Sequence, residues 1–225
     1  LKLIMSGHVI KSTLLGKKIL SLELKNPKKN NALSLKMLDE IIALLTHKNL
    51  TTKYNILVFR GFQDGVFSAG ADLSEVRVLK KEKNLNIYHS KLNKLLKILN
   101  KLQLVKISII KSYCIGAGFI LAMNTDICIA NTNCLFSIPA SKLNIKLPAN
   151  QLDFLMKKFP GNPLLKEAIL TGRKFSSSEA YNFNIINKVL NEKNFKKNYL
   201  AFLENFILIN DRSLRHYHKK LFNIL

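Results

Sequence analysis

Two short stretches decide the fold of this chain: Phe67-Ser68-Ala69-Gly70-Ala71-Asp72 and Gly116-Ala117-Gly118. Each follows a β-rich apolar run, and each leads into a segment with the pattern of a helix. Small residues at such a turn bring backbone N–H groups close to a ligand, because no side chain intervenes. Two converging N–H groups, one of them beside a helix N-terminus, stabilise an oxygen that becomes negative during a reaction. The two stretches therefore predict a backbone cradle suited to thioester and enolate chemistry.

The rest of the sequence alternates strands with helices and then becomes helical. The expected strands are a hairpin with alternation over Ile19 to Leu24 and Gly16-Lys17 at its turn, followed by Ile56 to Phe59, Val105 to Ile110, Ile127 to Ala130 and Leu135 to Ser137. The expected helices are one capped by Ser34, then Asn84 to Lys101, Asn150 to Phe159, Leu164 to Leu170, one opened by the capping box Ser176-x-x-Glu179, and Arg212 to Leu225. This order predicts one α/β domain over residues 1–225, with a core over about 1–148 and a helical region over about 149–225.

Four motifs in this order resemble the enoyl-CoA hydratase/isomerase (crotonase) superfamily. Asn31-Ala32-Leu33 is similar to the opening motif of that family, and Phe67 to Leu73 to its first oxyanion segment. Tyr113 to Ala130 is similar to the second oxyanion segment with the strand that follows, and Phe136-Ser137-Ile138-Pro139 leads into a stretch that carries catalytic chemistry in the family. The resemblance covers about Leu20 to Val189 and implies a spiral of ββα units that assembles into trimers or hexamers. The C-terminal trimerisation segment looks shortened here.

The resemblance also implies the roles of individual residues. The backbone N–H groups of Ala71 and Ala117 would form the oxyanion hole. The hydratases of the family carry two catalytic glutamates, at positions that match Ile120 and Ala140. Neither side chain can act as an acid or a base, so ordinary hydration should be impaired. The remaining substrate-binding positions are Ala69, Gly70, Asp72, Leu73, Gly116 and Pro139.

Other polar residues give weaker indications. Asp72 fits a turn held by its own side chain, a role in the CoA-binding loop as in the family, or both, and Asp126 fits a cap of the preceding helix turn. Serine nucleophiles are disfavoured because no histidine lies near them in the sequence. The five histidines are expected to be mostly solvated, and no metal site is expected; they are His8, His47, His89, His216 and His218.

Composition bounds the class of protein. The formal net charge is +22, mostly from lysine, and the densest lysines fit the solvated face of an amphipathic helix: Lys91, Lys94, Lys97 and Lys101. Apolar runs are too short for a membrane span, and the beginning of the sequence lacks the apolar region of a signal peptide. The three cysteines fit buried apolar positions and a reducing cytoplasm.

Several functions remain compatible with these residues. The leading hypothesis is an acyl-CoA-binding protein that stabilises a thioester enolate, with coenzyme A as part of the substrate and no further cofactor. The alternatives are a catalytically inactive acyl-CoA-binding pseudoenzyme, an acyl-CoA decarboxylase-like enzyme, and a relative that binds RNA through surface lysines. The decarboxylases use a tyrosine where this chain has Leu147 or Pro148.

Overall fold

A computed structural model describes residues 4–15 and 18–222 of the chain. In this part there are ten strands: β1 (Ile4–Ser6), β2 (Val9–Leu14), β3 (Ile19–Leu24), β4 (Ile56–Gly61), β5 (Val105–Ile110), β6 (Tyr113–Ile115), β7 (Ile127–Asn131), β8 (Leu135–Ser137), β9 (Lys174–Ser176) and β10 (Lys188–Leu190). The same part contains ten α-helices: α1 (Leu35–Leu45), α2 (Leu50–Lys53), α3 (Leu73–Lys81), α4 (Leu85–Lys101), α5 (Ala117–Met123), α6 (Ala149–Lys158), α7 (Pro163–Thr171), α8 (Ser177–Asn182), α9 (Phe195–Ile207) and α10 (Asp211–Phe222).

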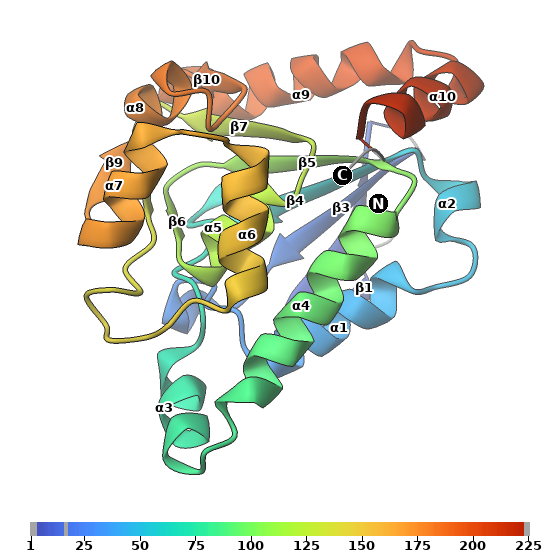
Figure 1. Cartoon of the computed structure of the whole chain (residues 1–225). Helices are drawn as coiled ribbons and strands as arrows, with labels where there is room; N and C mark the ends of the chain where they lie inside the picture. Colours follow the sequence, from blue (N-terminus) through green and yellow to red (C-terminus); the bar gives the residue numbers. More distant parts are fainter. Residues whose placement is uncertain (1–3, 16–17, 223–225) are drawn as a thin grey trace.

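The strands form a large and a small sheet (Figure 1). The large sheet has the order β1-β2-β3-β4-β5-β7-β10, and its strands are parallel from β3 onward. The small sheet has the order β6-β8-β9. Two isolated parallel bridges accompany it: Ser68 pairs with Cys114 in β6, and Leu33 pairs with Ala71. The chain thus returns repeatedly from the large sheet to the small one, which confirms the expected spiral of ββα units.

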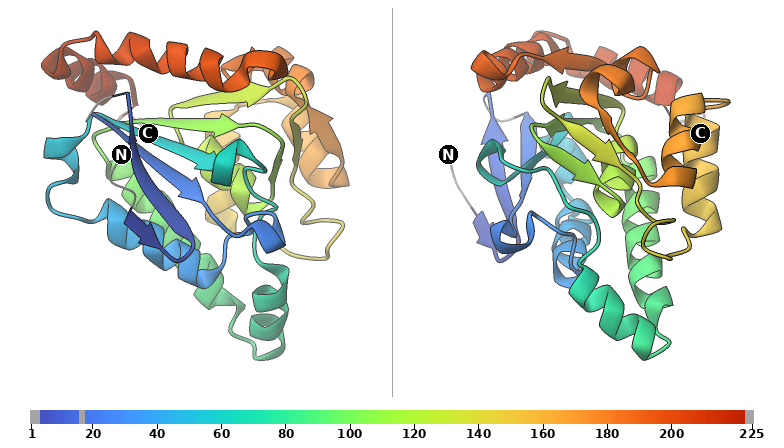
Figure 2. Two further views of the ribbon diagram at one scale, coloured as in Figure 1. Left: turned by 180° about the vertical axis from the view of Figure 1, so that it is seen from behind. Right: turned by 90° about the vertical axis from the view of Figure 1, so that its left-hand side faces the viewer.

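Helices cover both faces of the large sheet (Figure 2). On one face the main apolar cluster joins the sheet to α1, α4, α5 and the small sheet. On the other face a second cluster packs β3, β4, β5 and β7 against α9 and α10. Ser34 accepts a hydrogen bond from the Met37 N–H, and Ser176 and Glu179 form a complete capping box, so both expected helix starts are confirmed. No helix among the described residues is long and apolar enough to cross a membrane.

The expected first hairpin is present in the structure. β2 and β3 pair as expected, although the Gly16-Lys17 turn lies outside the described residues. The alternating polar residues of β3 do not face solvent, because both faces of this strand are buried. The polar face of β3 is covered because Arg60 binds Ser21 and Glu23 there. Because the buried guanidinium bonds to these polar side chains, they can be buried without a large energetic cost.

The region after residue 148 also departs from the expectation. It contains β9 and β10 as well as helices, so it is not purely helical. β10 extends the large sheet beside β7, and β9 completes the small sheet beside β8. These strands are three residues long, too short for a periodic pattern to show in the sequence. The three cysteines are buried free thiols, as expected.

A buried cluster of charges corrects the interpretation of two further residues. Asp126 does not cap the preceding helix turn: its carboxylate accepts hydrogen bonds from the Lys106 backbone N–H (2.7 Å) and pairs with the Lys106 amine (3.0 Å). His218 on α10, expected to be solvated, is 4% exposed and lies 2.9 Å from the same carboxylate. Burial alone would raise the pKa of Asp126, but His218 and Lys106 outweigh it and lower that pKa. Through these contacts the cluster holds α10 against the large sheet.

Replacing Asp126 by asparagine should lower the free energy of unfolding by about 2–3 kcal/mol, because charge-assisted hydrogen bonds to a buried lysine are lost. Burial already lowers the pKa of Lys106, and the variant leaves this amine without its counter-charge. Urea unfolding at neutral pH measures the change, with Asp153→Asn on the exposed face of α6 as the matched control. Equal stability of the two variants would contradict the prediction. In the wild type the stabilisation that the charged Asp126 provides should decrease as the pH falls below 3.8, the ordinary pKa of aspartate.

Candidate functional site

The two glycine turns lie against each other. Gly70 has a φ of +98° and Gly116 a φ of +54°, backbone conformations that glycine adopts without strain. The Ser68 N–H donates to the Tyr113 carbonyl (3.1 Å), and the Ile115 N–H donates to the Ser68 carbonyl (3.0 Å). A Cβ added at Gly70 would lie 2.8 Å from the Ile115 carbonyl oxygen and 3.5 Å from the Ala117 nitrogen. The sequence analysis predicts this convergence of the two turns, and the structure contains it.

The backbone N–H groups of Ala71 and Ala117 have no hydrogen-bond acceptor among the residues described. Their neighbours are satisfied: the Gly70 N–H donates to the Ser68 hydroxyl, the Asp72 N–H to the Leu33 carbonyl, and the Gly116 N–H to the Ser137 carbonyl. Both alanines line the same cavity of about 260 Å³. Most buried N–H groups in proteins are paired, so two unpaired ones beside the same cavity are unusual. Both are available to donate a hydrogen bond to a ligand oxygen.

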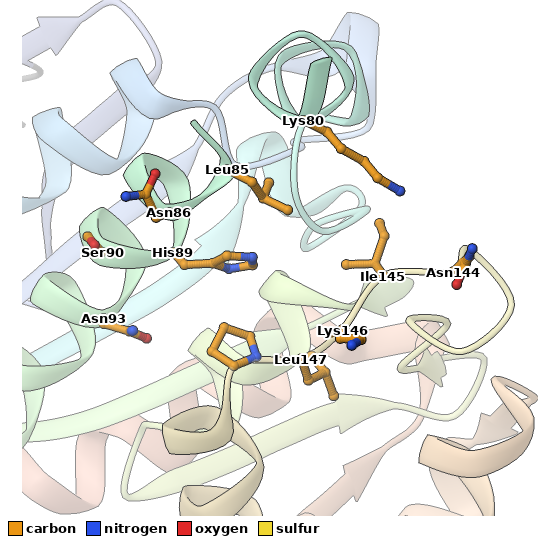
Figure 3. Close-up of a pocket in the computed structure, with 11 residues that line it drawn as sticks. Lys80, Leu85, Asn86, His89, Ser90, Asn93, Asn144, Ile145, Lys146 and Leu147 are labelled. Atoms are coloured by element: carbon orange, nitrogen blue, oxygen red, sulfur yellow. The ribbon is translucent and has the colours of Figure 1, made fainter. Parts of the chain in front are cut away.

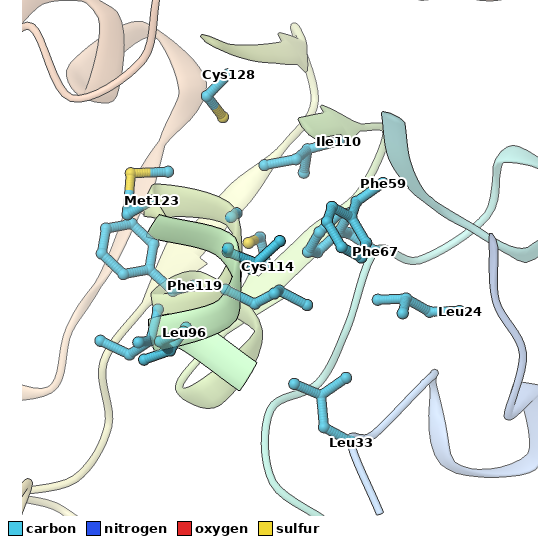
Figure 4. Close-up of a cluster of buried hydrophobic side chains, with 14 of the residues drawn as sticks. Leu24, Leu33, Phe59, Phe67, Leu96, Ile110, Cys114, Phe119, Met123 and Cys128 are labelled. Atoms are coloured by element: carbon cyan, nitrogen blue, oxygen red, sulfur yellow. The ribbon is translucent and has the colours of Figure 1, made fainter. Parts of the chain in front are cut away.

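Most of the residues that the sequence singles out line this cavity. Those that do are Ala69, Gly70, Ala71, Leu73, Gly116, Ala117, Pro139 and Ala140. Asp72 and Ile120 are not among the lining residues. Ile120 is fully buried in the main apolar cluster, which packs behind the turns through side chains such as Phe67, Cys114 and Phe119 (Figure 4).

Asp72 holds the first turn in place. Its carboxylate accepts hydrogen bonds from the Ser74 N–H (3.1 Å) at the start of α3 and from the Lys29 amine (2.7 Å). Burial alone would raise the pKa of Asp72, but the hydrogen bonds from Lys29 and Ser74 outweigh it and lower that pKa. The carboxylate therefore stays charged. It anchors the turn through a local hydrogen bond, one of the two roles that the sequence leaves open.

The wall opposite the turns comes from residues that the sequence analysis does not assign to the site. Tyr88 and His89 on α4 line the cavity, together with Gln151 on α6 and the segment from Leu143 to Leu147. A second hollow of about 570 Å³ adjoins it and shares His89 and Ile145 to Leu147 (Figure 3). The helical pattern of α4 shows only an apolar stripe and a basic face, so it gives no signal that two of its residues reach a cavity.

Few ionisable groups line the cavity. They are Tyr88, His89 and Lys146, with no carboxylate among the lining residues. Burial raises the pKa of Tyr88, whose hydroxyl donates to the Leu33 carbonyl (3.0 Å). Burial lowers the pKa of His89 below its usual 6.5, so this imidazole is neutral at pH 7. His89 is half-buried, which corrects the expectation of a solvated side chain.

Other candidate chemistries find no support in the described part of the chain. Ser68 is buried and its hydroxyl accepts from the Gly70 N–H, while the Ser137 hydroxyl donates to the Gly172 carbonyl. Neither hydroxyl bonds to a histidine there, so no activated serine is formed. Within residues 4–15 and 18–222, no group of three or more histidine, cysteine, aspartate or glutamate side chains is arranged to hold a metal ion.

Comparisons with known proteins agree on one family. The profile of the family described as enoyl-CoA hydratase/isomerase matches residues 15–222. A probable mitochondrial enoyl-CoA hydratase 2 of Arabidopsis thaliana is 27% identical over 75% of this chain and 56% of its own length. The mevalonyl-coenzyme A hydratase of Aspergillus fumigatus is 30% identical over 76% of this chain and 63% of its own length. The chain therefore spans less than two thirds of these curated relatives.

Solved structures share the fold. An enoyl-CoA hydratase/carnitine racemase from Magnetospirillum magneticum superimposes with a TM-score of 0.89 at 20% identity, over 97% of this chain and 81% of its own. A putative enoyl-CoA hydratase from Thermobifida fusca, solved in complex with acetoacetyl-CoA, gives a TM-score of 0.81 at 19% identity, over 94% of this chain and 85% of its own.

Proposed function

The chain belongs to the enoyl-CoA hydratase/isomerase family, and on that premise we propose that it binds an acyl-CoA thioester in the cavity between the two glycine turns. The thioester carbonyl oxygen would accept hydrogen bonds from the N–H groups of Ala71 and Ala117. A fold relative solved with acetoacetyl-CoA supports this class of ligand. Coenzyme A enters as part of the substrate.

One observation carries the proposal: the two N–H groups have no partner among the described residues and line the same cavity. Such donors stabilise the oxygen most when it becomes an enolate, because the negative charge develops there. Removing one donor of this kind costs about 3–4 kcal/mol of transition-state stabilisation in enzymes that use it. The site is therefore suited to reactions that form an enolate next to a thioester.

Ordinary hydration is not part of the proposal. The positions that match the two family glutamates carry Ile120, which is buried in the apolar core, and Ala140, which lines the cavity wall. The proposed activity is thus a reaction at the α-carbon of an acyl-CoA rather than the hydration of an enoyl-CoA.

Calorimetry with acetyl-CoA and crotonyl-CoA tests the proposed function. We expect saturable binding by the wild type, and at least tenfold weaker binding by Ala117→Leu, whose side chain would enter the cavity. Ala117→Gly is the matched control, because it keeps the N–H and adds no bulk. Gly70 is a poorer choice for substitution, because its positive φ strains any side chain placed there, independently of ligand binding. Absence of binding by the wild type up to millimolar concentration would remove the proposed function, and unchanged affinity in Ala117→Leu would move the site elsewhere.

We also propose that the protein works in a reducing compartment such as the cytoplasm. All three cysteines are free and buried, and burial raises the pKa of each thiol; that of Cys134 rises to about 12. Such thiols are chemically inert, which supports a packing role over disulfide formation.

A further inference from the structure

His89 lies where the two hollows meet. It is on α4, and its ring points toward the segment from Ile145 to Leu147 on the opposite side (Figure 3). The inner hollow, shared with the Ala71 and Ala117 N–H groups, is the proposed thioester site. One imidazole and the two backbone donors therefore line the same small cavity.

The polar atoms of this imidazole are not used by the fold. The Nδ1 atom is buried and has no hydrogen-bond partner in the described part of the chain. The ring packs edge-on against Tyr88, with ring centroids 6.2 Å apart, but the Tyr88 hydroxyl donates to the Leu33 carbonyl instead. A buried polar atom without a partner is rare in proteins, so a hydrogen bond within the described part of the fold does not explain the position of His89.

The charged groups around His89 do not favour its protonated form. Lys80 on α3 and Lys146 on the opposite segment line the hollows, whereas Gln151 on α6 is neutral. Two carboxylates, on α3 and at its start, are engaged elsewhere: Asp72 pairs with Lys29, and Glu75 accepts from the Leu35 N–H (2.8 Å). Burial disfavours the charged imidazole and lowers the pKa of His89, so the ring is neutral at pH 7 and can accept a proton.

We propose that His89 is the acid–base catalytic residue of this site, removing and returning a proton at the carbon next to the thioester carbonyl. This inference rests on the proposed function. In the forward step the α C–H bond breaks and its proton forms an N–H bond on the imidazole. The C–H electron pair becomes the C=C bond of the enolate, and the carbonyl π pair moves to the oxygen, which the Ala71 and Ala117 N–H groups stabilise. The reverse step returns a proton, so the net reaction needs no oxidant or co-reactant.

Exchange of α-protons with solvent tests this step directly. Butyryl-CoA is incubated with the protein in D₂O, and mass spectrometry follows deuterium uptake. We expect measurable exchange by the wild type, and a 10²–10⁴-fold slower rate in His89→Gln, the usual effect of losing a general base. His216→Gln on the exposed face of α10 is the matched control and should keep the wild-type rate.

The pH dependence separates catalysis from packing. A base must be deprotonated to act, so the wild-type exchange rate should rise with pH and level off above a break that lies below 6.5. His89→Gln should lose this break, whereas a variant that only loosens the pocket would keep it. Exchange at the wild-type rate by His89→Gln, a break that survives in it, or no exchange by a wild type that binds butyryl-CoA would each overturn the inference. Failure to bind any CoA thioester would instead overturn the proposed function.

Discussion

Crotonyl-CoA should be hydrated more slowly by this protein than by a family member that carries both glutamates, by about 10²–10⁴-fold for each missing group. Hydration needs a base that activates water and an acid that protonates the α-carbon. Ile120 and Ala140 supply neither group, and no carboxylate of residues 4–15 and 18–222 lines the cavity. His89 offers one titratable group where the reaction uses two. The loss of absorbance of the conjugated thioester measures the rate.

The structure also shows which gain-of-function variant is the cleaner test. Ala140 is partly exposed on the cavity wall, so Ala140→Glu adds a carboxylate at the site without disturbing the core. Ile120 is fully buried among apolar side chains, so Ile120→Glu would also place a charge in the core. The single Ala140→Glu variant is therefore expected to fold and to hydrate faster than the wild type, with Ala140→Gln as its matched control.

A wild-type hydration rate equal to that of ordinary hydratases would contradict this prediction. The sequence points first to Glu75 as a replacement acid, because it follows the first turn by a few residues. The structure disfavours it, since the Glu75 carboxylate accepts from the Leu35 N–H and does not line the cavity. A fast rate that disappears in His89→Gln would identify the imidazole as the group that replaces both glutamates.

The two glycine turns can be predicted from the sequence. Short runs of small residues after apolar strands are local signals, and Gly70 and Gly116 both adopt the positive φ that such turns use. Their convergence follows from the parallel neighbours β4 and β5, which deliver both turns to the same edge of the sheet. The strand and helix pattern therefore determines the positions of the Ala71 and Ala117 N–H groups.

The side-chain part of the site cannot be predicted in this way. His89 lies between the exposed and the buried faces of α4, and the face it presents depends on how α4 packs against α1 and α3. The opposite wall comes from residues 143–147, more than fifty positions later in the chain. The cluster of Lys106, Asp126 and His218 is missed for the same reason, because its members meet only after the C-terminal helices fold back.

Replacing Arg60 by methionine should lower the free energy of unfolding by about 3–5 kcal/mol, because it leaves two buried carboxylates without a counter-charge. Arg60 is 8% exposed, and its guanidinium binds Glu23 (2.6 Å) on β3 and Asp64 (2.8 Å) just after β4. Burial alone would lower the pKa of Arg60, but the acidic neighbours outweigh it and raise that pKa, so the positive charge is fixed. Methionine fills a similar volume, which limits the effect of an empty cavity.

Denaturant unfolding at pH 7 measures this change. The Asp64 carboxylate also accepts from the Tyr199 hydroxyl on α9 (3.0 Å), so Tyr199→Phe is a matched control that removes one hydrogen bond and no charge. We expect Tyr199→Phe to cost about 1 kcal/mol. A deficit in Arg60→Met that is equal to or below that of Tyr199→Phe would show that the guanidinium does not hold the polar face of β3 together.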